Sequence, residues 1–167
     1  MGCGKSSSGR KAARRARVRF WDTDVEVERA EGASVTDIFR YAGEEYFRNA
    51  ERNAVERIAS QPGDAIISTG GGLPAWGDNM ERLNAVGKTV YLRMSAGSIA
   101  ERLSPYGRER RPLLRGLNDE ELRDFIARGI AERERYYLKA HCVVEADALS
   151  SDDMAERIAG IFKSYGQ

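Results

Sequence analysis

The chain has 167 residues, of which 41% are hydrophobic and 32% charged, and its formal net charge is +1. This length suits one domain, and the near-neutral charge creates no field that would attract nucleic acid or a membrane surface. Its two cysteines, Cys3 and Cys142, suggest no disulfide framework, and no apolar run approaches the roughly 20 residues of a membrane span. We therefore expect a soluble, cytoplasmic monomer without nucleic-acid or membrane partners.

The chain begins with most of a phosphate-binding loop, Gly2-Cys3-Gly4-Lys5-Ser6-Ser7. In such loops, backbone N–H groups and the start of the following helix converge on the phosphates. The lysine reaches the terminal phosphates, and the serine after it ligates Mg²⁺. We predict a helix from residue 7 to about residue 16, and the loop indicates nucleotide chemistry.

Other patterns overlap this start. Met1-Gly2-Cys3-Gly4-Lys5-Ser6 also fits N-myristoylation, with Cys3 placed for a second acyl chain. The arginines that follow could form a nucleic-acid patch or a transit peptide. We favour the nucleotide site, because later motifs complete it, and we interpret the basic run as the solvated face of a helix.

Short β-like runs at residues 18–21, 65–69, 89–92 and 142–145 alternate with helical sequence, including long helices at 44–60 and 119–139. Alternation of this kind predicts an α/β fold with a parallel sheet between helices. Ser34, Asn118 and Ser150 are expected helix caps. Residues 104–117 combine Pro and Gly with several arginines, which is typical of a mobile cationic lid.

Two polar segments follow expected strands. Asp22-Thr23-Asp24 falls at the carboxyl end of the first, where ligands bind in open α/β sheets. One carboxylate could order the water shell of a metal and the other address a substrate hydroxyl, although Asp24 could also serve as a helix-capping acid. Gly70-Gly71-Gly72 follows the second strand and leaves backbone amides bare for a small ligand, the alternative being a plain loop.

The motifs together resemble those of the shikimate kinase family across the whole chain. In order they are the loop at residues 2–7, Asp22-Thr23-Asp24 with Glu28, Gly32-x-Ser34-Val35-x-Asp37-Ile38-Phe39, Gly43-Glu44-x-x-Phe47-Arg48-x-x-Glu51, Gly70-Gly71-Gly72, Arg111-Pro112-Leu113-Leu114 and Arg133-x-x-x-Tyr137-x-x-Ala140. The resemblance implies one domain over residues 1–167 with a three-layer P-loop kinase fold. It also implies a substrate-binding region at residues 24–60, a lid at 104–117 and phosphorylation of the shikimate 3-hydroxyl by ATP with Mg²⁺.

The resemblance also implies roles for individual residues. Lys5, Asp24 and Arg111 would be catalytic, with Ser6 and Asp22 at the metal. The nucleotide would contact Gly2, Cys3, Gly4, Lys5, Ser6, Ser7, Arg102, Arg111 and Leu149. Shikimate would contact Asp24, Arg48, Gly70, Gly71, Gly72 and Arg133, because paired guanidinium groups suit its carboxylate and an aspartate suits the reacting hydroxyl.

The family's sheet has five strands, and this sequence supplies four candidates. The strand expected before the phosphate loop is not among them. We therefore expect the start to have been assigned too late, with about eight to ten apolar or β-branched residues encoded upstream. Two alternatives stay open. A kinase for another hydroxy acid, such as gluconate, would leave Arg48, Arg133 and the glycine triplet unexplained as a set, and a non-catalytic relative would retain the motifs without activity.

Overall fold

The computed structural model describes residues 2–103, 105–109 and 112–165. In chain order its elements are α1 (Lys5–Ala16), β1 (Arg19–Asp22), α2 (Thr23–Glu31), α3 (Val35–Tyr41), α4 (Gly43–Ala59), β2 (Ala65–Ser68), η1 (Leu73–Ala75), α5 (Asn79–Val86), β3 (Val90–Arg93), α6 (Ala96–Arg102), α7 (Pro105–Glu109), η2 (Pro112–Leu114), α8 (Asp119–Tyr137), β4 (Cys142–Glu145) and α9 (Ser151–Tyr165). The predicted strands lie within one residue of the observed ones, and the α/β fold is confirmed.

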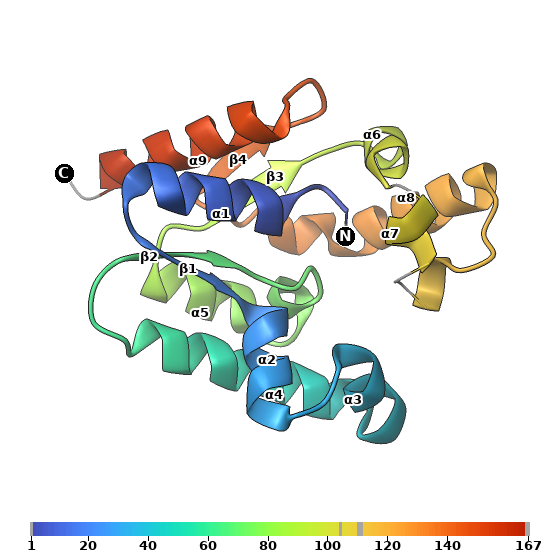
Figure 1. The fold of residues 1–167 in the computed structure, drawn as a ribbon, viewed down its shortest axis with the longest axis horizontal. Helices are drawn as coiled ribbons and strands as arrows, with labels where there is room; N and C mark the ends of the chain where they lie inside the picture. Colours follow the sequence, from blue (N-terminus) through green and yellow to red (C-terminus); the bar gives the residue numbers. More distant parts are fainter. Residues whose placement is uncertain (1, 104, 110–111, 166–167) are drawn as a thin grey trace.

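The strands pair in parallel, but within the described residues they form two separate sheets and no continuous one. β1 pairs with β2, with Asp22 opposite Ser68, and β3 pairs with β4, with Val90 opposite Cys142. Neither β2 nor β3 has a second strand partner in this part of the chain. Figure 1 shows the two pairs as distinct units between the helices.

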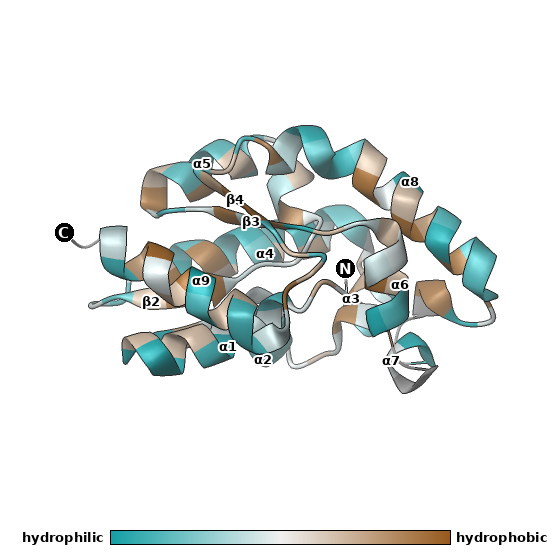
Figure 2. Cartoon of the chain, turned by 90° about the horizontal axis from the view of Figure 1, so that it is seen from above, coloured by the Kyte–Doolittle hydropathy of each residue, from teal (hydrophilic) through white to brown (hydrophobic). Residues whose placement is uncertain are grey.

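Helices cover both faces of the strands. α1 and α9 lie side by side on one face, and α4 and α5 lie on the other (Figure 1). The α1–α9 contact is close because it is made by small side chains, Ala12, Ala155 and Ala159, all of them buried. In Figure 2, strands β3 and β4 have apolar colours and lie among helices that carry both polar and apolar residues. This layering gives the three-layer arrangement that the sequence predicts.

The expected helix caps are present. Ser34 Oγ accepts a hydrogen bond from Asp37 N, and Asn118 forms a capping box with Glu121 at the start of α8. Ser150 Oγ accepts from Asp153 N. Because each cap satisfies a backbone donor that a helix start would leave free, the sequence fixes these helix boundaries locally.

The described residues form two larger apolar cores. One core gathers around β3, α6, α8 and α9, with Leu92, Ile99, Leu122 and Met154 buried in it. The other joins α2, α3 and α4 through residues such as Val27 and Phe47. The helices α2, α3 and α4 therefore have an apolar core of their own, separate from the core around β3.

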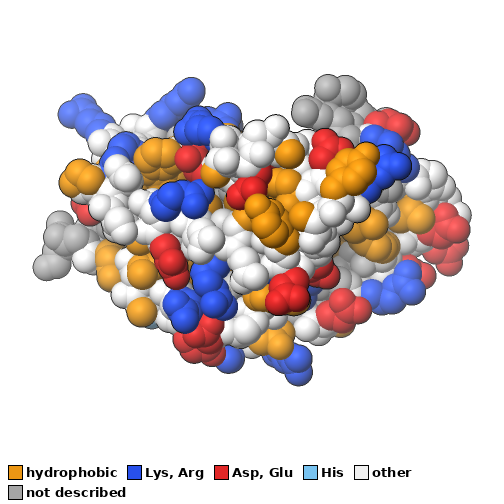
Figure 3. Space-filling model, turned by 90° about the horizontal axis from the view of Figure 1, so that it is seen from below, with side chains coloured by type: hydrophobic (Ala, Val, Ile, Leu, Met, Phe, Trp, Pro, Cys, Tyr) orange, Lys and Arg blue, Asp and Glu red, His pale blue; other side chains and the backbone are white. Residues whose placement is uncertain are grey.

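Positive and negative side chains are interspersed on the face drawn in Figure 3. In the described part of the chain, no helix has the length and apolar character needed to cross a membrane.

Candidate active site

The phosphate loop meets the start of α1 with two glycines in left-handed backbone conformation. Gly2 has φ 83° and Gly4, the N-cap of α1, has φ 87°. No side chain in the described residues caps this helix start. Its first N–H groups are therefore available to an anion, and the helix dipole favours negative charge there.

Ser6 and Asp22 are brought to one place by the end of β2. Ser6 Oγ lies 3.2 Å from Ser68 Oγ, and Ser68 is the register partner of Asp22. A hydroxyl and a carboxylate are hard oxygen ligands of the kind that Mg²⁺ uses when phosphates and water complete its coordination. No group of three or more acidic, cysteine or histidine side chains in the described residues could hold a metal alone. The donor set therefore fits a Mg²⁺ ion that arrives with a phosphate ligand.

Asp24 lies in the first turn of α2, next to Asp22. Asp22 caps this helix, and its Oδ1 accepts a hydrogen bond from Asp24 N at 3.1 Å. The Asp24 side chain is open to solvent on one side, but the protein around it raises the pKa of its carboxyl by desolvation, and the charge of Asp22 adds to the shift. The nearby positive charges of Lys5 and Arg48 oppose it. A carboxylate with a raised pKa between two cations is suited to holding a hydroxyl and taking its proton.

The glycine triplet allows charged side chains to approach the backbone closely. A Cβ atom on Gly70 would collide with Glu51 Oε1, and one on Gly72 would collide with the guanidinium of Arg48. Gly70 N donates to Thr23 Oγ1 at 3.0 Å, and Thr23 is fully buried. The triplet is therefore a packing requirement of the charged pocket beneath it, in addition to the ligand contact that the sequence predicts.

Arg48 is a buried cation with two acidic partners. Its guanidinium lies 2.5 Å from Glu51 Oε2 and 3.0 Å from Glu44 Oε1. Glu44 is mostly exposed, whereas the side chain of Glu51 is 0% exposed. The rings of Phe39 and Phe47 lie within 6 Å of the Arg48 guanidinium carbon. Rings and carboxylates together fix the orientation of this guanidinium.

Glu51 is a residue of this pocket to which the sequence analysis assigned no role. Burial raises the pKa of Glu51 to about 7, even though the ion pair with Arg48 acts in the opposite direction. Its Oε1 has no hydrogen-bond partner among the described residues. The sequence could have indicated this pairing through spacing, because a residue three positions after Arg48 lies on the same face of a helix.

Arg133 of α8 lies beside Tyr137, whose hydroxyl donates a hydrogen bond to Gly71 O of the glycine triplet at 2.5 Å. Burial raises the pKa of Tyr137, and the positive charges of Arg133 and Lys5 counteract this. Tyr137 therefore ties α8 to the glycine triplet, a contact that the sequence analysis does not predict.

Arg102 and Leu149 also lie together, on the other side of the phosphate loop. The Arg102 guanidinium donates to the backbone oxygens of Leu149 and Ala146. Met154 links this group to the loop, because its sulfur lies 4.0 Å from Arg102 Nη1 and its methyl would meet a Cβ on Gly4. The structure thus brings Arg102 and Leu149 together, with Met154 between them and Gly4 of the phosphate loop.

The expected lid contains two short helical turns, α7 and η2. Arg108 donates to Asp119 at 2.7 Å, and Arg115 donates to Glu109 O at 2.7 Å. Arg111, the predicted catalytic arginine of this segment, lies outside the described residues.

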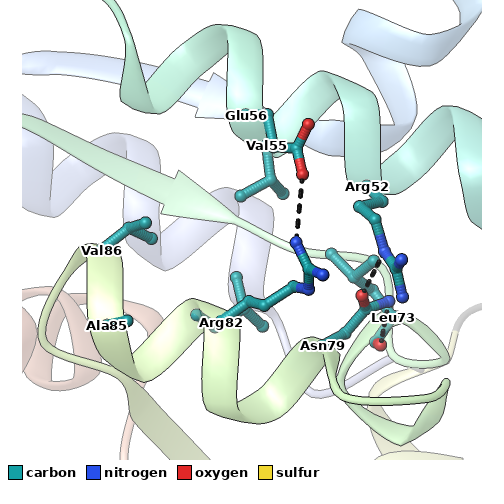
Figure 4. A pocket seen from close by; sticks show the side chains of 9 residues that line it. Arg52, Val55, Glu56, Leu73, Asn79, Arg82, Ala85 and Val86 are labelled. Carbon is teal, nitrogen blue, oxygen red and sulfur yellow. Dashed lines mark hydrogen bonds and ion pairs between the residues drawn. The ribbon is translucent and has the colours of Figure 1, made fainter.

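A separate pocket of about 180 Å³ lies between α4 and α5, away from the phosphate loop. Figure 4 shows Arg82 paired with Glu56, and Arg52 bonded to Asn79. Its remaining lining is largely apolar, with Val55, Leu73 and Val86. Because Arg52 and Arg82 are already paired, we assign no catalytic role to the residues that line this pocket.

Comparisons with known proteins agree with this geometry. A family model described as Shikimate kinase matches residues 1–163. A shikimate kinase of Parabacteroides distasonis is 41% identical over 152 residues, which cover 91% of this chain and 87% of that protein. The crystal structure of shikimate kinase from Bacteroides thetaiotaomicron is 35% identical, with a TM-score of 0.89 over 98% of this chain and 94% of that chain. Shikimate kinase from Acinetobacter baumannii in complex with shikimate is 31% identical, with a TM-score of 0.83 over 98% and 89% of the two chains.

Proposed function

We infer that this chain, which belongs to the shikimate kinase family, transfers the γ-phosphoryl group of ATP to the 3-hydroxyl of shikimate. The observation that carries the assignment is the position of Asp24, which lies within electrostatic reach of Lys5 on one side and Arg48 on the other. The first cation belongs to the phosphate loop and the second to the buried pocket below the glycine triplet. In this proposal, Asp24 would act where the phosphoryl donor meets the anionic acceptor.

Shikimate has one carboxylate and three hydroxyls, and the charged pocket offers matching groups. Arg48 and Arg133 would bind the carboxylate, since a guanidinium donates two parallel hydrogen bonds to such an anion. Glu44 is the exposed partner of Arg48 and shares its guanidinium with buried Glu51. The substrate carboxylate would replace Glu44, while Glu51 would continue to hold the guanidinium in place.

Asp24 would accept the hydrogen bond of the reacting hydroxyl. Its raised pKa makes its carboxylate a stronger base for the proton of that hydroxyl. Lys5 would neutralise charge on the transferring phosphoryl group, because in phosphoryl transfer the protein mainly positions groups and balances charge. Gly70, Gly71 and Gly72 would line the acceptor with backbone, and Tyr137 would keep Gly71 in place through its hydrogen bond.

Ser6 and Asp22 would hold Mg²⁺, Ser6 directly and Asp22 through its water shell. When bound, the ion would screen the phosphate charges and help to align the phosphates of ATP. Both residues adjoin Ser68, which supports placing the ion at the carboxyl edge of β1 and β2.

For the adenine side we propose Arg102 and Leu149, supported by their mutual contact beside Gly4. Arg111 is proposed as the lid cation that reaches the phosphates. We further propose a cytoplasmic monomer, consistent with two free cysteines among the described residues and with a surface of mixed charge.

The assignment is tested by incubating the protein with ATP and Mg²⁺ and either shikimate or gluconate, and identifying the product by ³¹P NMR. A phosphate ester on the 3-position of shikimate, and none on gluconate, is the expected result. Asp24→Asn should remove turnover and leave the affinity for ATP nearly unchanged. Turnover of gluconate, or nucleotide binding without transfer to either acid, would contradict the proposal and favour the two alternatives named above.

A further inference from the structure

Glu51 is a buried carboxyl group of which only one oxygen is paired. Its Oε2 accepts a hydrogen bond from Arg48 Nη1 at 2.5 Å, whereas its Oε1 has no hydrogen-bond partner among the described residues. The Glu51 side chain is 0% exposed, so bulk solvent does not reach Oε1. A buried carboxylate with one oxygen unpaired is costly, and binding a proton removes that charge. The geometry therefore makes Glu51 a group that can exchange a proton while the protein stays folded.

The unpaired oxygen lies on the same side of Gly70 as the carboxyl of Asp24. A Cβ on Gly70 would collide with Glu51 Oε1 and would lie 3.0 Å from Asp24 Oδ1. Burial raises the pKa of Glu51 to about 7, and the charge of Asp24 adds to this shift. Near neutral pH, Glu51 is therefore divided between its charged and its neutral form.

Charged groups on several elements surround Glu51. On α4, Arg48 favours the charged form of Glu51 and Glu44 opposes it, and on α2 Asp24 opposes it as well. Further charges act on Asp24 and Tyr137, which border the pocket: these are Lys5, Glu28 and Arg133. All of these groups belong to the chain with or without a ligand. The direction in which the proton affinity of Glu51 changes on binding therefore depends on the charge that the ligand brings.

An acid substrate brings a negative charge into this balance. Arg48 divides its guanidinium between Glu44 and Glu51, and the side chain of Glu44 is 56% exposed, so water already screens its charge. A substrate carboxylate that replaces Glu44 would hold its charge inside the pocket and displace water from it. A less screened anion and a lower local polarity both favour the neutral form of a nearby carboxyl group.

We propose that Glu51 takes up one proton from solvent when the acid substrate binds and releases it when the substrate or product leaves. The proton would lie on Oε1, while Oε2 would continue to accept the hydrogen bond from Arg48. Glu51 is then a positioning residue, because it acts on the substrate through Arg48. This inference rests on the proposed function, since it requires a carboxylate ligand at Arg48.

Calorimetric titration with shikimate in buffers of different ionisation enthalpy counts the protons. The buffer supplies any proton that the complex takes up, so the observed heat varies with the ionisation enthalpy of the buffer, and the slope gives the number of protons. The wild-type protein is compared with Glu51→Gln and with the matched control Glu56→Gln, which changes an exposed residue of the same helix. At about pH 7.5, the wild type and the control should each take up about 0.5 proton per shikimate, and Glu51→Gln about none.

The pH dependence of affinity separates proton uptake from a merely structural role of Glu51. Affinity for shikimate should fall about three- to tenfold between about pH 6 and pH 8.5 in the wild type and in Glu56→Gln. In Glu51→Gln it should stay level over this range, because a structural loss is the same at every pH.

Carbon-13 NMR of the wild type with labelled glutamate carboxyl groups keeps the test decisive if Glu51→Gln does not fold. The carboxyl resonance that titrates near neutral pH should move its midpoint upward by about one pH unit when shikimate is added. An unmoved midpoint would contradict the inference.

The outcomes separate this inference from the function on which it rests. Binding of shikimate without any dependence of the heat on buffer would overturn proton uptake and leave the proposed function intact. Uptake that persists in Glu51→Gln would assign the proton to another group, such as Asp24, and would also overturn it. Failure of the wild type to bind shikimate at all would contradict the proposed function and this inference together.

Discussion

The acceptor pocket and the cavity between the two strand pairs both adjoin strand β2 but are built in opposite ways. At the end of β2, Arg48, Glu51 and the glycine triplet are in such close contact that a single Cβ on Gly70 or Gly72 would collide. Alongside β2, the cavity has a volume of about 420 Å³ and is lined largely by apolar side chains. The first region is a closely packed polar network, and the second is an open and mostly apolar space.

The two regions should respond differently to substitution. In the pocket, the charge of Arg48 is paired within the chain with Glu44 and Glu51. Around the cavity, the lining is largely apolar. We expect changes in the pocket to alter catalysis and binding, and changes in the cavity lining to alter stability.

The largest effect is expected at Lys5, which lies where the two regions meet. Lys5→Ala should lower kcat by about 10²–10³-fold, as expected when a preorganised charge partner of the transition state is removed. Steady-state kinetics check this against Lys11→Ala on the same helix, whose exposed lysine pairs only with Asp152 among the described contacts. Near-normal kcat in Lys5→Ala would remove it from the mechanism.

Glu51 tests whether burial of a carboxyl group in the pocket makes the stability of the protein depend on pH. Its pKa of about 7 in the folded protein lies above the ordinary value of 4.5 for a glutamate, so between these values the folded state binds more protons than the unfolded state. The contribution of Glu51 to stability is therefore present below pH 4.5 and lost as pH rises to about 7, a change on the order of 3 kcal/mol at most.

Urea unfolding at a series of pH values measures this effect. The stability of the wild-type protein relative to Glu51→Gln should fall as pH rises from about 4.5 to about 7. Glu56→Gln, on the exposed side of the same helix, serves as the control and should show no such trend. A difference between wild type and Glu51→Gln that stays constant over this range would contradict the burial argument.

Gly72 tests the close approach of backbone to Arg48. Gly72→Ala should weaken acceptor binding by about 1–3 kcal/mol, since the added methyl forces the guanidinium to move. Gly87→Ala is the matched control, because its φ is −177° and no atom lies within 4 Å of a Cβ there. Calorimetric titration with shikimate distinguishes the two, and equal affinity in both variants would mean that Arg48 can shift without loss.

The smallest effect is expected at Glu44. If the substrate carboxylate takes its place on Arg48, Glu44→Gln should tighten shikimate binding by about two- to fivefold, the size of an exposed ion pair. Glu45→Gln, also exposed on the first turn of α4, should leave the affinity unchanged. Weaker binding in Glu44→Gln would show that this carboxylate supports the substrate rather than competing with it.

Local signals in the sequence were sufficient for most of the fold. The caps at Ser34 and Asn118 and the four β-like runs each depend on residues close in the chain, and each lies where the sequence predicts. The division of the strands into two pairs depends on which edges meet in space, and no local pattern contains that information.

The site likewise combines features that the sequence predicts with features that only the structure shows. The phosphate loop, Asp24 and Arg48 are recognisable as motifs, but the role of Glu51 becomes visible only when its burial and its distance to Gly70 are known. Tyr137 is similar, because its bond to Gly71 joins residues 66 positions apart. Contacts of this kind are set by packing and not by spacing along the chain.

The central claim is that Arg48 and Arg133 form an acceptor pocket distinct from the nucleotide site, and calorimetric titration of shikimate and of a non-hydrolysable ATP analogue tests it most directly. Arg48→Ala and Arg133→Ala should each weaken shikimate binding by about 10- to 150-fold, the loss expected for a charge-assisted contact of about 1.5–3 kcal/mol. Affinity for the analogue should stay within about threefold, and Arg128→Ala, exposed on α8, should change neither. Equal losses of both ligands, or unchanged binding of shikimate, would contradict the account.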